Sequence, residues 1–108
     1  MAKLKLISEP TFKAKVPVPV AGADKPVMVE MTFKHKTRTD FLKWRDTLPN
    51  EGESRPDLDA VMDVLCGWEL DDQFNRENVE TLLENYLGAA FNILQTYTDQ
   101  LLQAQLKN

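Results

Sequence analysis

The sequence is poor in the residues that most often carry chemistry. Its 108 residues include one cysteine, Cys66, and one histidine, His35. A single cysteine cannot form an internal disulfide, so the fold does not depend on an oxidising compartment. The two residues cannot supply the Cys and His pairs of a zinc site, and neither a G-x-G-x-x-G run nor a Walker loop is present. These absences argue against a disulfide scaffold, a zinc protein and a nucleotide-binding enzyme.

Long apolar runs are also absent. No run approaches the roughly 20 apolar residues of a membrane span, and the N-terminal stretch MAKLKLISEPTF is too polar for a signal peptide. We therefore expect a cytoplasmic protein with no membrane partner. A chain of 108 residues is expected to form a single domain over residues 1–108.

The charges are divided unevenly along the chain. Residues 1–45 carry ten basic and four acidic residues, whereas residues 46–108 carry three basic and thirteen acidic residues. Two interpretations are open. The two halves attract each other and keep the fold soluble, or the charges form a docking surface that steers a partner.

Two N-terminal stretches alternate apolar and polar residues, as half-buried strands do. Residues 11–20 place Phe12, Ala14, Val16, Val18 and Val20 on one side, and residues 26–36 do the same with Val27, Val29, Met31 and Phe33. The turn-rich AGADKP between them predicts an antiparallel hairpin. Because Pro17 and Pro19 cannot donate to a ladder, the first strand is expected at a sheet edge.

Helical periodicity follows the hairpin part, residues 1–36. Thr37 begins a capping box, and Phe41 and Trp44 follow at helical spacing. A second helix is expected to carry Leu58, Val61, Met62 and Leu65 on one stripe and to end at Gly67. A third helix is expected to start at Asn75, and Gly88 to break the run before a last helix over residues 89–106. A hairpin part followed by a helical part, residues 37–108, with three to four helices predicts an α+β fold.

The stretch GWELDDQF, residues 67–74, places three acids between aromatic residues. An EF-hand needs ligands at alternating positions and a central glycine, but Asp71 and Asp72 are adjacent and no glycine follows them. We therefore expect no metal site and no catalytic site here. Trp68, with Leu70 and Phe74, is expected to close over the ends of two helices as a structural turn.

A nucleic-acid interface is a further hypothesis for the basic end of the hairpin. Lys34, His35, Lys36 and Arg38 form a basic strand end beside Phe33 and Trp44, and phosphate binding needs such a patch. However, the chain is acidic overall, with a net charge of −4, and carries no recognisable nucleic-acid-binding motif. Nucleic acid is therefore not an expected partner.

Residues 67–101 resemble the C-terminal half of the tail assembly chaperones of long-tailed bacteriophages, of the siphophage type. In that family a Gly-Trp pair and an acidic turn with a phenylalanine introduce a helix, followed by a Tyr-x-Gly-Ala-Ala element and a helix with a late tyrosine. The matching positions are Gly67, Trp68, Asp71, Asp72, Phe74, Asn78, Leu82, Leu83, Tyr86, Gly88, Ala89, Ala90, Ile93 and Tyr97. The two N-terminal strands are similar to those of the family as well, whereas Leu87 stands where the family often has a proline. Among the matching positions, Gly67, Trp68, Phe74, Tyr86 and Gly88 are expected to be structural.

The resemblance implies a binding protein without enzymatic activity, cofactor or metal. Members act in the host cytoplasm during virion morphogenesis, bind the long, helical, aggregation-prone tape measure protein, and are absent from the finished virion. Many are also made as a longer, frameshifted form whose extra domain recruits the tail tube protein. Self-association into a ring or filament would present many weak sites along one client. The alternatives are a connector or completion subunit that persists in the particle, and a nucleic-acid-binding module.

The last helix supplies the candidates for a partner surface. Its apolar stripe includes Ala90, Phe91, Leu94, Tyr97 and Leu101, and Leu102 and Leu106 widen it beyond what one core needs. Tyr97, Leu102 and Leu106 are therefore the candidate partner-binding residues. The competing interpretation is that the terminal leucines cover their own core.

Overall fold

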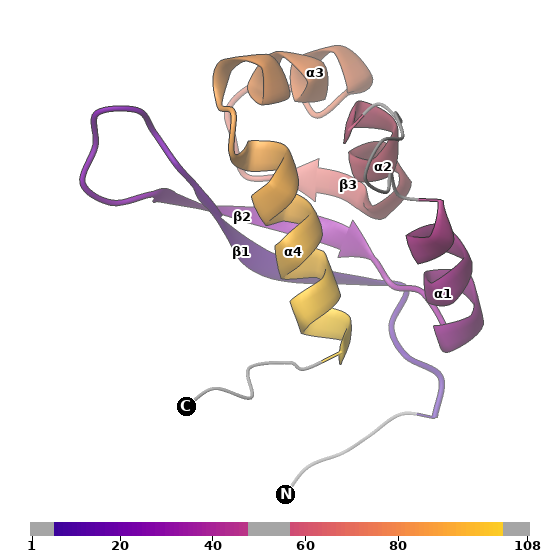
Figure 1. Cartoon of the computed structure of the whole chain (residues 1–108). Helices are drawn as coiled ribbons and strands as arrows, with labels where there is room; N and C mark the ends of the chain where they lie inside the picture. Colours follow the sequence, from indigo (N-terminus) through magenta and orange to yellow (C-terminus); the bar gives the residue numbers. More distant parts are fainter. Residues whose placement is uncertain (1–5, 48–56, 103–108) are drawn as a thin grey trace, which may run out of the picture.

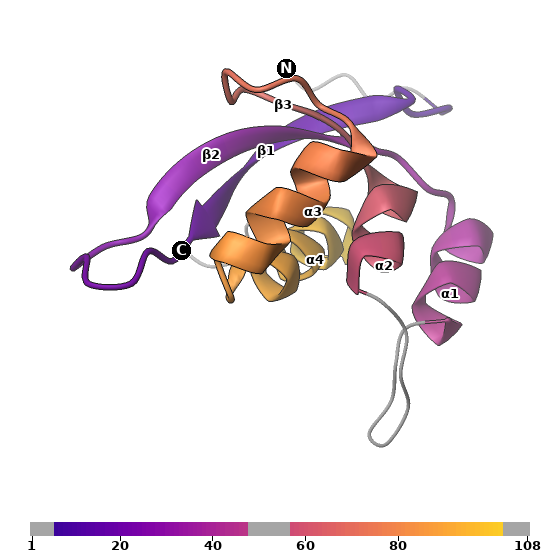
Figure 2. The ribbon, with the colours of Figure 1, turned by 90° about the horizontal axis from the view of Figure 1, so that it is seen from above.

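The computed structural model describes residues 6–47 and 57–102. Its antiparallel sheet has the strand order β1-β2-β3, with bounds Thr11–Val18, Val27–Lys34 and Leu65–Trp68. Its helices are α1 (Arg38–Asp46), α2 (Asp57–Val64), α3 (Arg76–Asn85) and α4 (Ala89–Leu102) (Figure 1). The helices all lie on one face of the sheet (Figure 2), and the α+β fold predicted from the sequence is confirmed. No helix within the described ranges is long and apolar enough to cross a membrane.

The hairpin follows the predicted alternation. β1 pairs with β2 in unbroken register from Thr11–Lys34 to Val18–Val27, and β1 is an edge strand, as the prolines require. The inward residues near the middle of the hairpin are buried, but Val27 is 53% exposed. It lies near the loop end of the hairpin, which extends beyond the helices (Figure 1).

The predicted end of the second helix is wrong. α2 stops at Val64, and Leu65–Trp68 form β3, which pairs antiparallel with β2 between Met31 and Phe33. Gly67 therefore lies inside a strand and opposite Thr32 rather than at a helix cap. A short apolar run is compatible with a helix end or a strand, and only the open edge of β2 decides between them because it offers backbone hydrogen bonds.

Local sequence signals fix the starts of two helices. The hydroxyl of Thr37 accepts a hydrogen bond of 3.2 Å from the Asp40 N–H at the start of α1. The side chain of Asn75 accepts one of 2.8 Å from the Asn78 N–H at the start of α3. Both side chains satisfy backbone donors that the first turn of a helix leaves free. The predicted break at Gly88 is also present, because α3 ends at Asn85 and α4 begins at Ala89.

The core lies between the sheet and the helices. Tyr97 of α4 is fully buried, and its ring lies 5.4 Å from the rings of Phe33 and Trp44, measured between centroids. α4 begins at Ala89 as predicted and is described as far as Leu102. The predicted stripe is wrong at Phe91, which is 68% exposed, whereas Ile93 is fully buried. With 3.6 residues per turn, Ile93 and Tyr97 lie on the same helix face as Ala90, which is buried. Phe91, the residue after Ala90, is turned away from that face.

Candidate functional site

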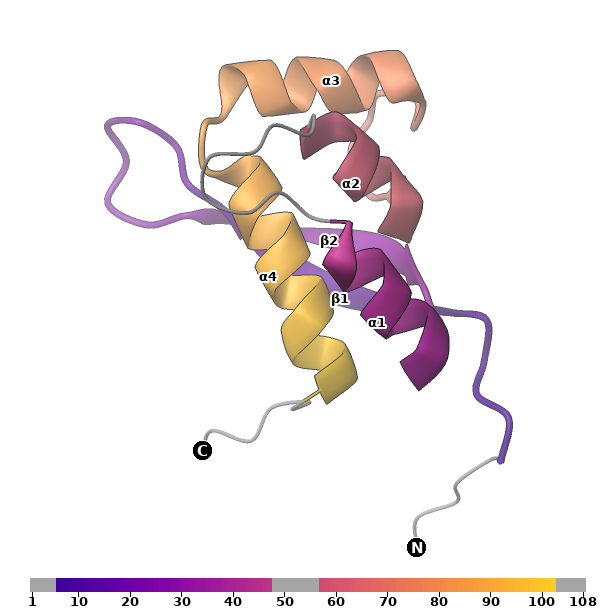
Figure 3. The same ribbon diagram turned by 45° about the vertical axis from the view of Figure 1, so that its right-hand side comes forward.

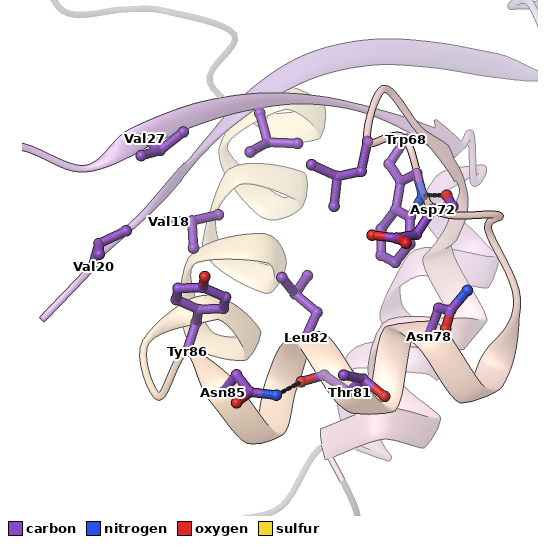
Figure 4. Close-up of a pocket in the computed structure, with 12 residues that line it drawn as sticks. Val18, Val20, Val27, Trp68, Asp72, Asn78, Thr81, Leu82, Asn85 and Tyr86 are labelled. Atoms are coloured by element: carbon purple, nitrogen blue, oxygen red, sulfur yellow. Dashed lines mark hydrogen bonds between the residues drawn. The ribbon is translucent and has the colours of Figure 1, made fainter.

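An apolar groove of about 550 Å³ opens between the loop end of the hairpin and α3 (Figure 4). Valine side chains of the hairpin form one wall, namely Val18 of β1, Val20 just after it, and Val27 and Val29 of β2. The rest of the apolar surface comes from Trp68 and Leu70 at β3 and from Leu82 and Tyr86 at α3. Polar side chains from the turn and the helix lie around it, namely Asp72, Asn78, Thr81 and Asn85.

The groove is open because β3 is shorter than the strand it pairs with. β2 has eight residues and β3 has four, and their pairing ends at Met31 and Trp68. Glu69 closes this end of the ladder: its N–H donates to the Glu30 carbonyl at 3.0 Å, and its carboxylate accepts from the Glu30 N–H at 2.8 Å. The chain then leaves the sheet for α3. The part of β2 before Met31 therefore has no β3 residues beside it, and its side chains Val27 and Val29 line the groove.

The acidic stretch forms a turn that Trp68 holds in place. The indole N–H of Trp68 donates to the Asp72 carbonyl at 2.8 Å, and its ring packs edge-to-face on Phe74 with 5.3 Å between centroids. Trp68 is half-buried at the end of β3 and faces the groove, and with Leu70 and Phe74 it packs against the core. Its expected closure over two helix ends stays a prediction. Within residues 6–47 and 57–102, no group of three or more His, Cys, Asp or Glu side chains could hold a metal ion.

Of the five predicted structural residues, Trp68 and Tyr86 line the groove. Gly67 and Trp68 lie in β3, and Phe74 lies just before α3. Tyr86 follows the last residue of α3, donates its N–H to the Leu82 carbonyl at 3.0 Å, and lines the groove. Gly88 lies between α3 and α4, close to Pro19 of the hairpin. The fold therefore brings residues that are scattered over the sequence to one side of the sheet.

The candidate partner-binding residues are separated by the structure. Tyr97 is fully buried and belongs to the core, so it presents no surface to a partner in this conformation. Leu102 is 58% exposed at the end of α4. Leu106 lies outside the described residues. A partner-binding role for these positions stays a prediction.

The valines of the groove were not predicted as site residues. The alternation in residues 11–20 and 26–36 places Val18, Val20, Val27 and Val29 on the inward side of the hairpin and gives no indication of which inward positions the helices reach. The only available signal was the continued alternation of valine on both sides of the AGADKP loop. The missing information is the position of α3, which follows from tertiary packing.

Comparison with protein families gives one match that covers the chain. The model of the phage tail assembly chaperone family matches residues 1–108. Searches of curated proteins and of solved structures give no match. Because the family match spans the full sequence, the chain belongs to the phage tail assembly chaperone family.

Proposed function

We propose that this protein binds the tape measure protein of its phage and keeps it soluble and competent for polymerisation of the tail tube. Membership of a tail assembly chaperone family supports the general role and points to a non-enzymatic one. The apolar groove between the hairpin and α3 is the proposed contact site. The single observation that supports it most is the exposure of Val27 at 53% beside a groove that no part of the described chain fills.

The chemistry of the groove fits a segment of a long amphipathic helix. Such a segment buries a stripe of apolar side chains in an apolar groove and keeps its polar face towards a polar rim. Here the valine wall and Leu82 supply the apolar surface, and Asn78, Thr81 and Asn85 supply polar groups along α3. A groove of this size accommodates a few side chains, so each copy would bind weakly, and several copies along one client would bind with avidity.

The proposal includes the biological setting. The complex forms in the host cytoplasm, and the chaperone leaves before the virion is complete. Self-association into a ring or filament, and recruitment of the tail tube protein by a longer frameshifted form, belong to the same proposal. Mass spectrometry of purified virions tests the departure step, which predicts that the protein is absent from the particle while the tape measure protein is present.

Co-expression with the candidate tape measure protein tests the groove. Val27→Lys places a charge on its apolar wall, and we expect less soluble tape measure protein and less co-purification because a buried unpaired charge opposes binding. Met28→Lys is the matched control. Met28 is the next residue of β2, is 49% exposed, and points to the opposite face of the sheet, outside the groove lining.

The two variants together decide the result. The proposed site is supported when Val27→Lys loses the client, Met28→Lys retains it, and both proteins keep the thermal midpoint of the unmodified chain. Equal retention by both variants would move the contact site away from the groove. Failure of the unmodified protein to solubilise or co-purify with its tape measure protein would overturn the proposed function.

A further inference from the structure

A second groove lies where the end of the hairpin, α1 and the end of α4 meet. Its volume is about 470 Å³, and it shares no lining residue with the valine-walled groove. Four apolar side chains contribute to its surface, namely Phe41 and Leu42 of α1 and Leu101 and Leu102 of α4. Leu42 and Leu102 are 39% and 58% exposed, so the groove has an accessible apolar surface. Figure 3 shows α1 beside the C-terminal half of α4, and side chains from both helices line the groove.

Among the described residues, the charged groups that line this groove all have the same sign. Lys36, Arg38 and Arg45 are basic, His35 is the only other titratable side chain among them, and none of them is acidic. Within the part of the chain that the structure describes, none of these four forms an ion pair. The charges therefore act on whatever enters the groove. This concentration of positive charge occurs in a protein whose net charge is −4.

The spacing on α1 organises the charges around the apolar surface. Arg38, Phe41, Leu42 and Arg45 all line the groove and follow at intervals of three, one and three residues, so they share one helix face. The two arginines stand seven residues apart, about 10 Å along the axis, with the apolar pair between them. Arg45 lies over the Phe41 ring, 5.8 Å from its centroid, so its guanidinium is held beside the apolar surface.

From this charge pattern, we infer that the groove is a docking surface for an acidic amphipathic helix of another protein. A partner helix with leucine on one stripe and carboxylates about two turns apart beside it would bury its leucines against Leu42 and Leu102. Its carboxylates would lie next to the two arginines, which can form paired hydrogen bonds with a carboxylate. This inference is independent of the proposed tape measure groove and goes beyond it, because it adds a second partner-binding surface with its own charge requirement.

The surface fits a protein segment better than a nucleic acid. Single-stranded nucleic acid binds where basic groups are combined with exposed aromatic rings on which bases stack. The aromatic neighbours of this groove are not available for stacking, because Phe33 is fully buried and Phe41 and Trp44 are only 3% and 5% exposed. Its accessible surface is aliphatic, as an amphipathic helix requires.

A designed peptide tests the inference without knowledge of the natural partner. The probe is a fluorescein-labelled amphipathic helix of about 18 residues, five turns, with leucine on one face and glutamate beside it. Two control peptides replace every glutamate by lysine or scramble the order so that the apolar face is lost. Fluorescence anisotropy with the full-length protein should detect binding of the acidic peptide alone, and the affinity should fall with added salt.

Charge variants test the position of the site. Arg38→Glu combined with Arg45→Glu should weaken the acidic peptide by at least about tenfold. Lys13→Glu combined with Lys15→Glu changes the net charge equally, on exposed residues of β1 outside the groove. It should change the affinity by less than about twofold, because these side chains alternate with the inward residues of β1 and point away from the helices. The double variant Arg38→Gln and Arg45→Gln removes the charges without reversing them. It replaces the glutamate variant in the binding test if the glutamate variant does not fold.

An apolar pair of variants completes the test. Leu102→Ser should weaken the peptide, whereas Leu87→Ser should not, because Leu87 is 93% exposed and lies outside the groove lining. Equal losses in the matched variants, or equal binding of the acidic and basic peptides, would overturn the inference. Tighter binding of a single-stranded oligonucleotide than of the peptide would also overturn it. A third result would overturn the inference as well: the peptide fails to bind, and sedimentation velocity shows a homo-oligomer that the arginine variants dissociate.

Discussion

The hydroxyl of Tyr97 donates a hydrogen bond of 2.7 Å to the backbone carbonyl of Lys34, at the last residue of β2. This bond joins α4 to β2, the central strand with which both β1 and β3 pair. The Tyr97 ring also packs on Phe12 and Phe33 of the hairpin and on Trp44 of α1. One side chain therefore connects both ends of the described chain.

Tyr97→Phe should lower the free energy of unfolding by about 1–2 kcal/mol, because it removes one hydrogen bond and leaves the Lys34 carbonyl without its partner. The aromatic packing remains, so the loss should be much smaller than that of Tyr97→Ala, about 3–5 kcal/mol for a buried aromatic residue. Urea unfolding of the two variants measures both values. Equal stability of Tyr97→Phe and the unmodified protein would show that the bond makes no net contribution.

Alkaline pH should destabilise the fold through the same residue. Burial raises the pKa of the Tyr97 hydroxyl above its ordinary value of 10.0. Below pH 10 the hydroxyl is protonated in both states, but above pH 10 the unfolded chain releases the proton while the folded chain retains it. Stability contributed by this group should therefore fall by up to about 1.4 kcal/mol for each pH unit above 10. Urea titrations at several alkaline pH values should show a steeper loss for the unmodified protein than for Tyr97→Phe; parallel losses would exclude this origin.

Gly88→Ala should destabilise the junction between α3 and α4. A Cβ at this position would lie 2.9 Å from Cγ of Pro19, which is too close for an ordinary contact. We expect a loss of about 1–3 kcal/mol, as for other overpacked positions. Gly67→Ala is the control, because its Cβ would meet Thr32 at an ordinary 3.5 Å. In a double-mutant cycle, Pro19→Ala should recover part of the loss, and strict additivity would contradict the proposed clash.

Trp68→Ala should lower the free energy of unfolding by about 2–3 kcal/mol, below the 3–5 kcal/mol of fully buried aromatic residues, because Trp68 is only half-buried. Trp68→Phe separates the two interactions of the indole. It retains a ring against Phe74 but loses the hydrogen bond to the Asp72 carbonyl, at a cost of about 1 kcal/mol. Thermal denaturation of both variants provides the measurement. An unchanged midpoint for Trp68→Ala would contradict a structural role.

The sequence by itself determined the features that depend on near neighbours along the chain. Alternation defined the hairpin, the prolines placed β1 at an edge, and the side chains of Thr37 and Asn75 marked the starts of α1 and α3. Gly88 marked the break before α4. These signals are local, since a strand face, a helix cap and a helix break each depend on residues only a few positions away along the chain.

Only the tertiary structure decided the features that depend on a distant surface. Leu65–Trp68 became a strand because β2 offered an unpaired edge, although the same residues also fit the end of a helix. Tyr97 was placed in the core by rings from the hairpin and α1, and Phe91 was left exposed although the sequence pattern grouped it with the core. Val18 and Val27 line a groove because β3 ends before β2 does and α3 crosses beyond it. The hydrophobic effect is not directional, so an apolar residue does not specify which distant element will cover it. The position of a site built from apolar residues is therefore set by tertiary packing and not by the local sequence pattern.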